Sequence, residues 1–477
     1  MTTKITIIGA GPGGYIAAIR AAQMGAEVTV VEKENVGGTC LNWGCIPSKI
    51  MITTAELLEK FHRAQEFGIA AEGTFRADME KLMARKNAVI QSQSKGILGL
   101  FKHHKINYIL GTAAIAGPHR VTVAQDAGDE REVAWDKLIL ATGTAPFEIP
   151  SMPFDGVKIL SSDHALSLTQ VPESIIIVGG GVIGCEFAFI LSSLGAKVTV
   201  VEALDRLLPI PSVDEDCSKL LQREMKKRKI KFIVNRTVDS FEERDGQLDV
   251  TIGPSPFLKA PSEKEAKPMQ VQVAQMLVCI GRKPNTSGIG LETIGLAPDE
   301  KGWIAANDRM ETGVADVYAI GDVLGPEKIM LAHVASTEGQ VAAENALGAN
   351  RQMDYRVVPG AIFTTPEVAN VGLSEAQARE NGFDVRADSV LFRTLGKAQV
   401  IGEIAGQAKI VADRPSGKVL GVHIVGPHAT DLIAEAALAM QMGGSVQDVA
   451  ATIHAHPTLA EIMLEVSCKA LDRSLHG

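Results

Sequence analysis

The chain has 477 residues and a net charge of −9, and its 46% hydrophobic and 22% charged shares suit a folded protein of about three domains. This net negative charge gives no indication of binding to nucleic acid or to an anionic membrane. Six cysteines in so long a chain do not make the disulfide framework of a secreted protein. No charged-then-apolar leader precedes Ile5 and no apolar run could span a bilayer, so we expect a cytoplasmic protein of enzyme size.

The first segment reads as a dinucleotide-binding βαβ unit. Residues 4–8 are an isoleucine-rich run typical of a buried parallel strand, and they lead into Gly9-Ala-Gly11-Pro-Gly-Gly14. A helix is expected over 15–24 and a second strand over 26–32, which ends on Glu32. In such a unit the glycines let the backbone approach a pyrophosphate, and the terminal acid binds a ribose hydroxyl. Strand, helix and acid are all in place, so the fingerprint is strong.

The next segment holds two closely spaced cysteines. Residues 37–49 read Gly-Gly-Thr-Cys-Leu-Asn-Trp-Gly-Cys-Ile-Pro-Ser-Lys, with four residues between Cys40 and Cys45. This spacing allows a disulfide, and so short a ring adds little stability to a large domain, because the stabilisation grows with loop length. It therefore suits a bond that opens and closes. Half of a metal site and two unrelated buried thiols are the alternatives, although no second Cys or His pair lies nearby at metal spacing.

The dinucleotide unit then recurs with an offset of 170 residues (179 − 9). An apolar strand at 175–178 is followed by Gly179-Gly-Gly181-Val-Ile-Gly184, a helix to about Leu194 and a strand at 196–202. Each copy places its terminal acid 23 residues after its first glycine (32 − 9 and 202 − 179), and each ends in Gly-Ala-x-Val-Thr-Val-Val-Glu. Two complete fingerprints imply two bound dinucleotides. The alternative is that one copy is only a structural crossover.

Several shorter segments combine a strand or helix with a glycine-bearing turn. They are a strand at 136–140 ending in Ala141-Thr142-Gly143, a strand at 275–280 ending in Gly281-Arg-Lys-Pro-Asn285, a strand within 316–323 carrying Gly321-Asp322, and a helix opened by Met330-Leu-Ala-His333.

Two segments in the second half of the chain are expected to be peripheral. Residues 253–267 mix Pro, Ser, Lys and Glu and are expected to be an exposed hairpin or loop, and residues 347–355 read as a linker. Beyond the linker, residues 408–412 and 419–425 read as strands and residues 430–442 as a helix. A separate C-terminal domain of mixed strands and helices is therefore predicted.

A pair of histidines stands near the end, in His454-Ala-His456-Pro457-Thr-Leu-Ala-Glu461. A lone histidine near an apolar segment is usually structural, and His-x-His can indicate a metal. No carboxylate or cysteine at suitable spacing supports a metal here, so no metal site is predicted. A carboxylate beside an imidazole fixes its tautomer and raises its basicity. No role is assigned to His454.

The pattern Gly-Gly-Thr-Cys-x4-Cys-x3-Lys resembles the redox-active disulfide of the class I pyridine nucleotide-disulfide oxidoreductases, and the resemblance runs nearly end to end. It implies an α/β fold with two Rossmann-like dinucleotide-binding domains and a C-terminal α+β dimerisation domain. The implied segments are a discontinuous FAD domain at 1–148 and 274–346, an NAD domain at 149–273 and an interface domain at 347–477.

The same resemblance implies an activity: oxidation of protein-bound dihydrolipoamide by NAD⁺, through a Cys40–Cys45 disulfide and FAD. His456 would take a proton from a substrate thiol and Glu461 would orient it, while Cys40 receives the thiolate and Cys45 faces the flavin. The histidine comes from the other subunit, so a homodimer is expected. The implied partners are lipoyl domains, or a lipoyl-bearing carrier protein, of the 2-oxo acid dehydrogenase or glycine cleavage complexes.

The resemblance also implies a set of cofactor contacts. For the flavin these are Gly9, Gly11, Gly14, Glu32, Lys49, Ala113, Thr142, Gly143, Thr144, Asp322, Met330, Leu331, Ala332 and His333, and for the nicotinamide nucleotide Gly179, Gly181, Gly184, Glu186, Glu202, Val238 and Gly281. Lys49 would stabilise the Cys45 thiolate and negative charge on the flavin, with Glu186 as its partner.

Other members of the family are the alternatives. Relatives reduce glutathione, trypanothione, coenzyme A disulfide or mercuric ion, and mercuric enzymes usually carry a C-terminal cysteine pair where this chain has only Cys468. NADPH-linked members place arginines where this chain has Glu202 and Ala203, and the nearest arginine here is Arg206. A non-catalytic assembly subunit is the alternative from a different class. Cys185, Cys217, Cys279 and Cys468 read as ordinary buried thiols.

Overall fold

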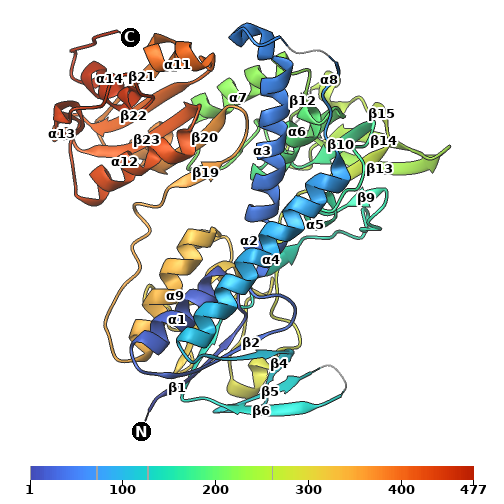
Figure 1. The fold of residues 1–477 in the computed structure, drawn as a ribbon, viewed down its shortest axis with the longest axis vertical. Coiled ribbons are helices and arrows are strands. Elements are labelled where there is room, and N and C mark those ends of the chain that lie inside the picture. Colours follow the sequence, from blue (N-terminus) through green and yellow to red (C-terminus); the bar gives the residue numbers. More distant parts are fainter. Residues whose placement is uncertain (1, 71–72, 126–127, 260–261, 477) are drawn as a thin grey trace. The chain divides into compact units, whose positions relative to one another are not determined.

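The computed structural model describes residues 2–70, 73–125, 128–259 and 262–476 (Figure 1). The chain divides into two compact units. The first consists of Met1–Ile50, Glu80–Phe147 and Gly281–Tyr355, and the second of Met51–Met79, Glu148–Ile280 and Arg356–Gly477. The four predicted domain segments subdivide the chain more finely and stay predictions.

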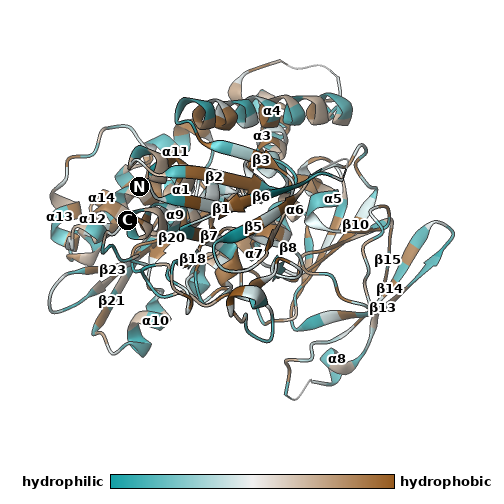
Figure 2. Ribbon diagram, turned by 90° about the horizontal axis from the view of Figure 1, so that it is seen from below, coloured by the Kyte–Doolittle hydropathy of each residue, from teal (hydrophilic) through white to brown (hydrophobic). Residues whose placement is uncertain are grey.

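The first unit is built on a five-stranded parallel sheet in the order β18-β7-β1-β2-β3. Its central strand is the run of isoleucines expected at 4–8, which is buried except at its first residue. β-branched side chains fit a sheet covered on both faces, and Figure 2 shows the hydrophobic colouring along β1, β2 and β7. The strands are β1 Lys4–Ile8, β2 Glu27–Glu32, β3 Asn107–Leu110, β7 Lys137–Leu140 and β18 Val317–Ala319.

The second unit contains a parallel sheet of the same design, in the order β9-β16-β10-β11-β12. In each sheet the first strand of the βαβ unit is central and the second lies beside it, so the sequence repeat is also a structural repeat. Further along the chain, each βαβ motif is followed by a three-stranded antiparallel sheet. These sheets are β4-β5-β6 and β13-β14-β15. The bounds are β9 Ile159–Leu160, β10 Ser174–Val178, β11 Lys197–Val201, β12 Lys231–Ile233, β16 Gln275–Val278, β4 Thr112–Ile115, β5 Arg120–Ala124, β6 Glu130–Ala134, β13 Arg236–Arg244, β14 Gln247–Pro254 and β15 Met269–Val273.

Both glycine motifs open a helix, as expected. α1 begins at Pro12, earlier than the expected residue 15, because proline is well suited to the first helical position and Gly11 caps the helix. α1 packs closely on α9, where a Cβ on Gly339 would lie 2.4 Å from the carbonyl oxygen of Gly13. The helices outside the C-terminal part are α1 Pro12–Gln23, α2 Gly38–Asn42, α3 Cys45–His62, α4 Met79–His103, α5 Ser162–Ala165, α6 Val182–Ser193, α7 Glu215–Lys227, α8 Glu263–Ala266 and α9 Ala332–Ala346.

The C-terminal part of the second unit is a five-stranded sheet of antiparallel pairs, in the order β19-β20-β23-β22-β21. α12 packs on β20 and β23, and α14 packs on β21 and β22. The strands predicted at 408–412 and 419–425 and the helix at 430–442 are confirmed within one or two residues. The elements are β19 Gly360–Ile362, β20 Glu367–Gly372, β21 Val385–Leu391, β22 Gln407–Asp413, β23 Val419–Gly426, α10 Glu375–Glu380, α11 Gly396–Ile401, α12 Ala429–Gln441, α13 Val446–Ala451 and α14 Glu461–Ala470.

The segment 253–267, which was predicted to be peripheral, includes parts of regular elements. Residues 253–254 belong to β14, a short helix α8 follows, and residues 260–261 lie outside the described part of the chain. Within the described ranges, no helix combines the length and the apolar composition needed to cross a membrane. The remaining elements are β8 Thr144–Pro146 and β17 Arg282–Pro284, which pair with each other, and the 3₁₀ helices η1 Ala64–Phe67, η2 Leu291–Ile294, η3 Gly321–Leu324 and η4 Phe392–Thr394.

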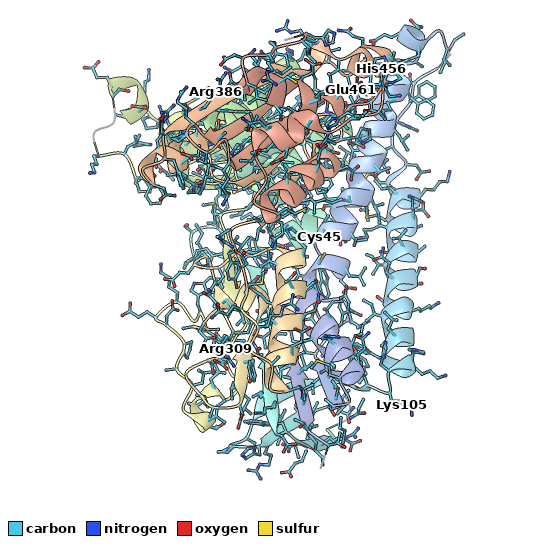
Figure 3. All side chains as sticks on the ribbon, turned by 90° about the vertical axis from the view of Figure 1, so that its left-hand side faces the viewer. Cys45, Lys105, Arg309, Arg386, His456 and Glu461 are labelled. Atoms are coloured by element: carbon cyan, nitrogen blue, oxygen red, sulfur yellow. The ribbon has the colours of Figure 1, made fainter. Side chains whose placement is uncertain are left out.

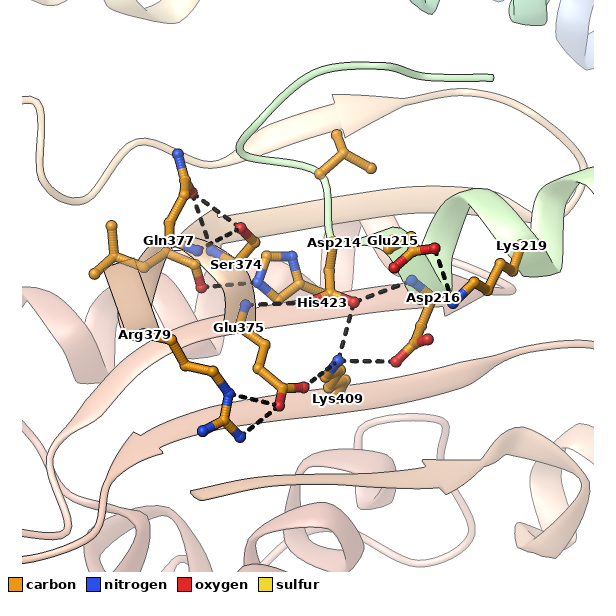
Figure 4. Close-up of polar contacts among 12 residues, drawn as sticks. Asp214, Glu215, Asp216, Lys219, Ser374, Glu375, Gln377, Arg379, Lys409 and His423 are labelled. Atoms are coloured by element: carbon orange, nitrogen blue, oxygen red, sulfur yellow. Dashed lines mark hydrogen bonds and ion pairs between the residues drawn. The ribbon is translucent and has the colours of Figure 1, made fainter. Parts of the chain in front are cut away.

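A buried lysine connects the C-terminal sheet of the second unit to the start of α7 (Figure 4). Lys409 on β22 contacts Asp214 at 3.0 Å, Asp216 at 2.8 Å and Glu375 at 2.8 Å. Asp214 also caps α7 and accepts a hydrogen bond from the Glu375 N–H. Burial lowers the pKa of Lys409, but the hydrogen bonds to the carboxylates outweigh it and leave the pKa raised. The cluster therefore holds α7, α10 and β22 together through charge.

Replacing Lys409 should destabilise the second unit, because three carboxylates would lose their shared cation. We expect Lys409→Met to lower the free energy of unfolding by about 3–5 kcal/mol, the usual effect of breaking a buried ion pair. Urea denaturation followed by circular dichroism measures this change. Lys219→Met is the matched control, since Lys219 forms an exposed pair with Glu215, and it should change little. Equal midpoints for the two variants would contradict the structural role of the cluster.

Candidate functional site

The first glycine loop forms a tight turn that no larger residue could make. A Cβ on Gly14 would lie 1.9 Å from the carbonyl oxygen of Gly9, and a Cβ on Gly9 would lie 2.2 Å from that of Ala141. Around Gly11, by contrast, the nearest atom to an added Cβ is 3.9 Å away. The loop is thus packed on its inner side and open at Gly11, where a pyrophosphate could approach backbone N–H groups at the start of α1.

Glu32 holds this loop in place. Its carboxylate accepts hydrogen bonds from the N–H of Ala10 at 2.8 Å and of Glu34 at 3.0 Å, and its side chain is buried. The sequence predicted a ribose contact for this acid, and its two oxygens retain lone pairs for one. The structure adds a second task, which is to fix the glycine loop against the end of β2.

The second glycine loop repeats this arrangement. A Cβ on Gly184 would lie 1.9 Å from the carbonyl oxygen of Gly179, and nothing lies within 4 Å of a Cβ on Gly181. Glu202 accepts hydrogen bonds from the N–H of Gly180 at 2.6 Å and of Leu204 at 2.8 Å. Both loops therefore fit a dinucleotide in the same way, each with a buried acid behind it.

Arg206, the nearest arginine to the second acid, is held by backbone carbonyls. Its Nη2 donates to the carbonyl oxygens of Ile210 and Val213, both at 3.0 Å, whereas its Nη1 is buried and makes no hydrogen bond within the described ranges. The guanidinium is thus engaged in the loop between β11 and α7. This arrangement leaves Glu202 as the charged group at the end of β11 that faces the glycine loop.

The two cysteines lie where a short helix gives way to a long one. Cys40 is in α2, and Cys45 is the first residue of α3 (Figure 3). Gly38 has a φ of 57°, and a Cβ there would lie 2.6 Å from the Cα of Gly11. The segment that carries the two cysteines therefore packs on the first glycine loop at Gly38, two residues before Cys40.

The two thiols interact with each other. A hydrogen bond with Cys45 is the largest cause, and burial the second, of a raised pKa for the Cys40 thiol. Cys45 lies at a helix N-terminus, where the partial positive charge favours a thiolate. Lys49, one turn further along α3, has its Nζ 3.4 Å from the hydroxyl of Ser48. The structure thus brings together the two cysteines that the sequence paired.

A polar network joins the turns predicted to contact the flavin. Thr144 donates to a carboxylate oxygen of Asp322 at 3.0 Å, and Arg282 donates to the hydroxyl of Thr144 at 2.6 Å. The hydroxyl of Thr142 is buried and makes no hydrogen bond within the described part of the chain. Buried hydroxyls normally have a partner, so this one marks a place where a bound cofactor would supply one.

The histidine and the acid near the end of the chain form a pair, as predicted (Figure 3). His456 Nδ1 lies 2.9 Å from Glu461 Oε1, and the other carboxylate oxygen accepts from the N–H of Thr458 at 2.9 Å. Burial opposes ionisation of Glu461, but the hydrogen bonds from Thr458 and His456 outweigh it and lower its pKa. His456 is 76% exposed on the single chain. An ionised carboxylate therefore orients an accessible imidazole.

The other predicted cofactor contacts lie in several helices, strands and turns, and their roles stay predictions. Glu186 is buried in α6 and accepts from the N–H of Phe363 at 3.0 Å, and Ala332 opens α9 just after Leu331. Cys185 and Cys217 are buried thiols, as predicted, whereas Cys279 and Cys468 are only half-buried. Burial raises the pKa of all four thiols. The remaining positions are Ala113 in β4, Val238 at a bulge in β13, Gly143 and Gly281 with positive φ, and Met330 and His333 at the start of α9.

Sequence reasoning missed several residues that shape these sites. Arg282 lies inside the predicted turn Gly281–Asn285 and was not singled out. Glu338 is buried, accepts from the N–H of Gly321 at 2.6 Å and from the hydroxyl of Tyr355 at 2.7 Å, and so holds the turn before Asp322. In the sequence, the one feature that could have drawn attention to Glu338 is its acidic side chain among the small residues of a predicted helix.

Comparisons with known proteins agree with this geometry. Residues 3–339 match the family model described as pyridine nucleotide-disulphide oxidoreductase, and residues 358–467 match its dimerisation domain. A dihydrolipoyl dehydrogenase from Bacillus subtilis is 41% identical over 99% of this chain and 98% of its own. A mitochondrial dihydrolipoyl dehydrogenase from Mesocricetus auratus is 39% identical over 96% and 94%. The crystal structure of LpdA from Mycobacterium tuberculosis superposes with a TM-score of 0.88 at 29% identity, covering 98% of this chain and 99% of that one.

Proposed function

Because the chain belongs to the pyridine nucleotide-disulphide oxidoreductase family, we propose that it oxidises protein-bound dihydrolipoamide to lipoamide with NAD⁺ as the acceptor. It is an enzyme, a flavoprotein disulfide oxidoreductase. The observation that carries the proposal is the contact of Cys40 with Cys45 beside the first glycine loop. Relatives at about 40% identity over nearly the whole chain are named dihydrolipoyl dehydrogenases, which does not favour glutathione, coenzyme A disulfide or mercuric ion as the substrate.

The thiol chemistry begins at His456. Its imidazole takes the proton from one substrate thiol, because only a thiolate attacks a disulfide efficiently. The thiolate attacks the sulfur of Cys40 in the Cys40–Cys45 disulfide, which forms a mixed disulfide and releases the Cys45 thiolate. The second substrate sulfur, once its proton has passed to the Cys40 sulfur that leaves, attacks the substrate sulfur of the mixed disulfide, which closes the lipoamide ring and releases Cys40 as a thiol. The enzyme thus gains two electrons as a dithiol.

Glu461 and Lys49 support these steps electrostatically. The Glu461 carboxylate holds the Nδ1–H of His456, so Nε2 is the nitrogen that accepts the substrate proton, and it stabilises the imidazolium that results. The Lys49 ammonium, with the N-terminus of α3, favours the Cys45 thiolate over the thiol. Pairing of Lys49 with Glu186 stays a prediction.

The glycine loops fit the two cofactors that the family uses, FAD and NAD. Gly9, Gly11, Gly14 and Glu32 would hold the flavin nucleotide, with Thr142 and Asp322 beside it. Gly179, Gly181, Gly184 and Glu202 would hold the nicotinamide nucleotide. When bound, FAD would accept the electrons of the dithiol and NAD⁺ would carry them away as hydride.

The active unit is proposed to be a homodimer in which each His456 serves the partner's cysteines. The family's dimerisation domain covers residues 358–467. On the single chain, large apolar side chains in α12 and near His454 and His456 are exposed: Leu438 by 63%, Met442 by 80% and Ile453 by 97%. Such an apolar surface is typical of a subunit interface.

The expected partners and location follow from the same proposal. A lipoyl group on a 2-oxo acid dehydrogenase component or a glycine cleavage carrier would reach the cysteines from outside the dimer. We expect the protein to work in the cytoplasm, because six cysteines in a chain of 477 residues do not make the disulfide framework of a secreted protein.

Counting thiols tests the proposal directly. The chain has six cysteines, so oxidised holoenzyme denatured without reductant should expose four reactive thiols (6 − 2), and holoenzyme first reduced with dihydrolipoamide and then freed of it should expose six. A Cys45→Ser variant should expose five in both states. Six thiols in the oxidised wild-type enzyme would contradict the redox disulfide.

Cofactor choice is expected to depend on Glu202. A phosphate at the adenosine ribose would face its carboxylate, and opposed like charges at a binding site cost several kcal/mol. We therefore expect kcat/KM to favour NAD over NADP by at least about a hundredfold. The double variant Glu202→Arg/Ala203→Arg should shift the preference markedly toward NADP.

The matched control for this change is Asp205→Arg, which alters the charge of an exposed neighbour three residues along. It should leave the NAD preference within a few-fold of the wild type. A wild-type enzyme that used the two cofactors comparably would show that Glu202 does not select between them.

A further inference from the structure

The other histidine of the predicted motif, His454, is nearly the opposite of His456 in its surroundings. Its side chain is 4% exposed, whereas that of His456 is 76% exposed, although only one residue separates them. Both lie in the loop that joins α13 to α14. His454 is therefore turned inward and His456 outward from the same short segment.

His454 makes two hydrogen bonds, one from each ring nitrogen. Nδ1 lies 2.9 Å from the carbonyl oxygen of Thr452, and Nε2 lies 2.9 Å from a carboxylate oxygen of Glu435. Both partners are acceptors, so a ring that carries both N–H groups donates to both. Glu435 belongs to α12, which packs on β20 and β23. The ring thus ties the loop to a helix that is fixed on the sheet.

The loop has few other ties. In the described part of the chain, no backbone–backbone hydrogen bond outside the helices and strands involves residues 453–457. Ile453 is 97% exposed, and the next apolar anchor along the chain is Leu459, which is 9% exposed. Within the loop, the hydroxyl of Thr458 donates to the carbonyl oxygen of Ala455 at 2.7 Å, and Glu461 sets the orientation of the His456 ring. The pair of His454 with Glu435 connects the loop to α12.

We propose that His454 is a positioning residue for the dithiol reaction: its bridge between Thr452 and Glu435 holds the loop so that His456 Nε2 meets the substrate thiol. The inference rests on the proposed role of His456 as the base. His454 does not touch the reacting atoms. Its effect is geometric, and a displacement of about 1 Å of a reacting group can cost about a hundredfold in rate.

Half-reactions of the FAD-loaded dimer test the proposal. His454→Phe keeps a ring of similar size and removes both hydrogen bonds. We expect reduction of the enzyme by dihydrolipoamide to slow by roughly 10- to 100-fold, and flavin reduction by NADH to stay within twofold. Stopped-flow absorbance follows both reactions. Equal slowing of the two half-reactions, or no slowing of the first, would overturn the proposal.

Variants of the acid provide an independent test if His454→Phe folds poorly. In Glu435→Gln the amide oxygen still accepts from Nε2–H, so its dithiol half-reaction should fall between those of the wild type and Glu435→Leu. The double variant His454→Phe/Glu435→Leu should be no slower than the worse single variant, because both remove one bridge. Multiplicative effects in the double variant would show that the two side chains act separately.

Two further proteins separate this inference from the proposed function. His476→Phe removes another histidine–glutamate contact of the same domain, His476 with Glu465 at 2.9 Å, and should leave both half-reactions unchanged. His456→Ala is measured alongside. If His456→Ala retains the dithiol half-reaction, the proposed function fails; if it loses that half-reaction while His454→Phe does not, only the positioning role fails.

Discussion

Cys45→Ser is expected to lower lipoamide turnover by at least about 10³-fold, since the dithiol can no longer form and loss of a reacting sulfur removes the covalent route. FAD binding should persist, because the glycine loop from Gly9 to Gly14 is unchanged. NADH should therefore still reduce the flavin and pass electrons to an artificial dye. Parallel steady-state assays with lipoamide and with the dye measure the two activities.

A cysteine outside the site provides the control for this experiment. Cys468 lies in α14, and Cys468→Ser should retain both activities. Near-wild-type lipoamide turnover in Cys45→Ser would show that the disulfide assignment is wrong. Loss of the dye activity together with bound FAD would instead point to damage of the fold.

His456→Ala is expected to slow the reaction of the enzyme with dihydrolipoamide by about 10²–10⁴-fold, the usual effect of losing a general base. Flavin reduction by NADH needs no base for a thiol, so it should change far less. Rapid-mixing measurements of the two half-reactions provide the comparison. Similar slowing of both would indicate that His456 is a structural residue.

Mixed dimers extend this prediction to the subunit arrangement. A dimer of one His456→Ala chain and one Cys45→Ser chain contains one intact set of groups only if the histidine acts on the partner's cysteines. Such dimers should recover close to half of the wild-type lipoamide activity, whereas either variant alone should have almost none. Mixed dimers as inactive as the parents would exclude action across the interface.

The parts of the fold that sequence predicted are those in which local chemistry determines structure. Isoleucine and valine runs next to Gly9 and Gly179 predicted both βαβ units, because buried parallel strands and tight glycine turns leave strong local signals. The strand at 275–280 ends at residue 278, two residues early, because the chain there turns into the glycine segment. The long helices α3 and α4 were not predicted in spite of their length.

In the candidate site, too, the sequence predicted the pairs that are close along the chain and missed those that are distant. Cys40 with Cys45 and His456 with Glu461 are close in sequence, so their spacing was informative. The partner of His454 is Glu435, 19 residues earlier in α12, and the partners of Lys409 lie as many as 195 residues away. Pairings of this kind depend on how helices and strands pack, and no periodicity in the sequence encodes them. For this reason His454 had no role until the structure showed its contacts.

The central claim is that the Cys40–Cys45 pair exchanges electrons between dihydrolipoamide and NAD⁺. The most direct test compares kcat/KM of the purified FAD-loaded enzyme for dihydrolipoamide with NAD⁺ against glutathione disulfide and coenzyme A disulfide with NADH or NADPH. We predict rapid NADH formation from dihydrolipoamide. For glutathione disulfide and coenzyme A disulfide we predict kcat/KM values at least about a hundredfold lower. A kcat/KM for glutathione disulfide or coenzyme A disulfide that equalled or exceeded that for dihydrolipoamide would contradict the account.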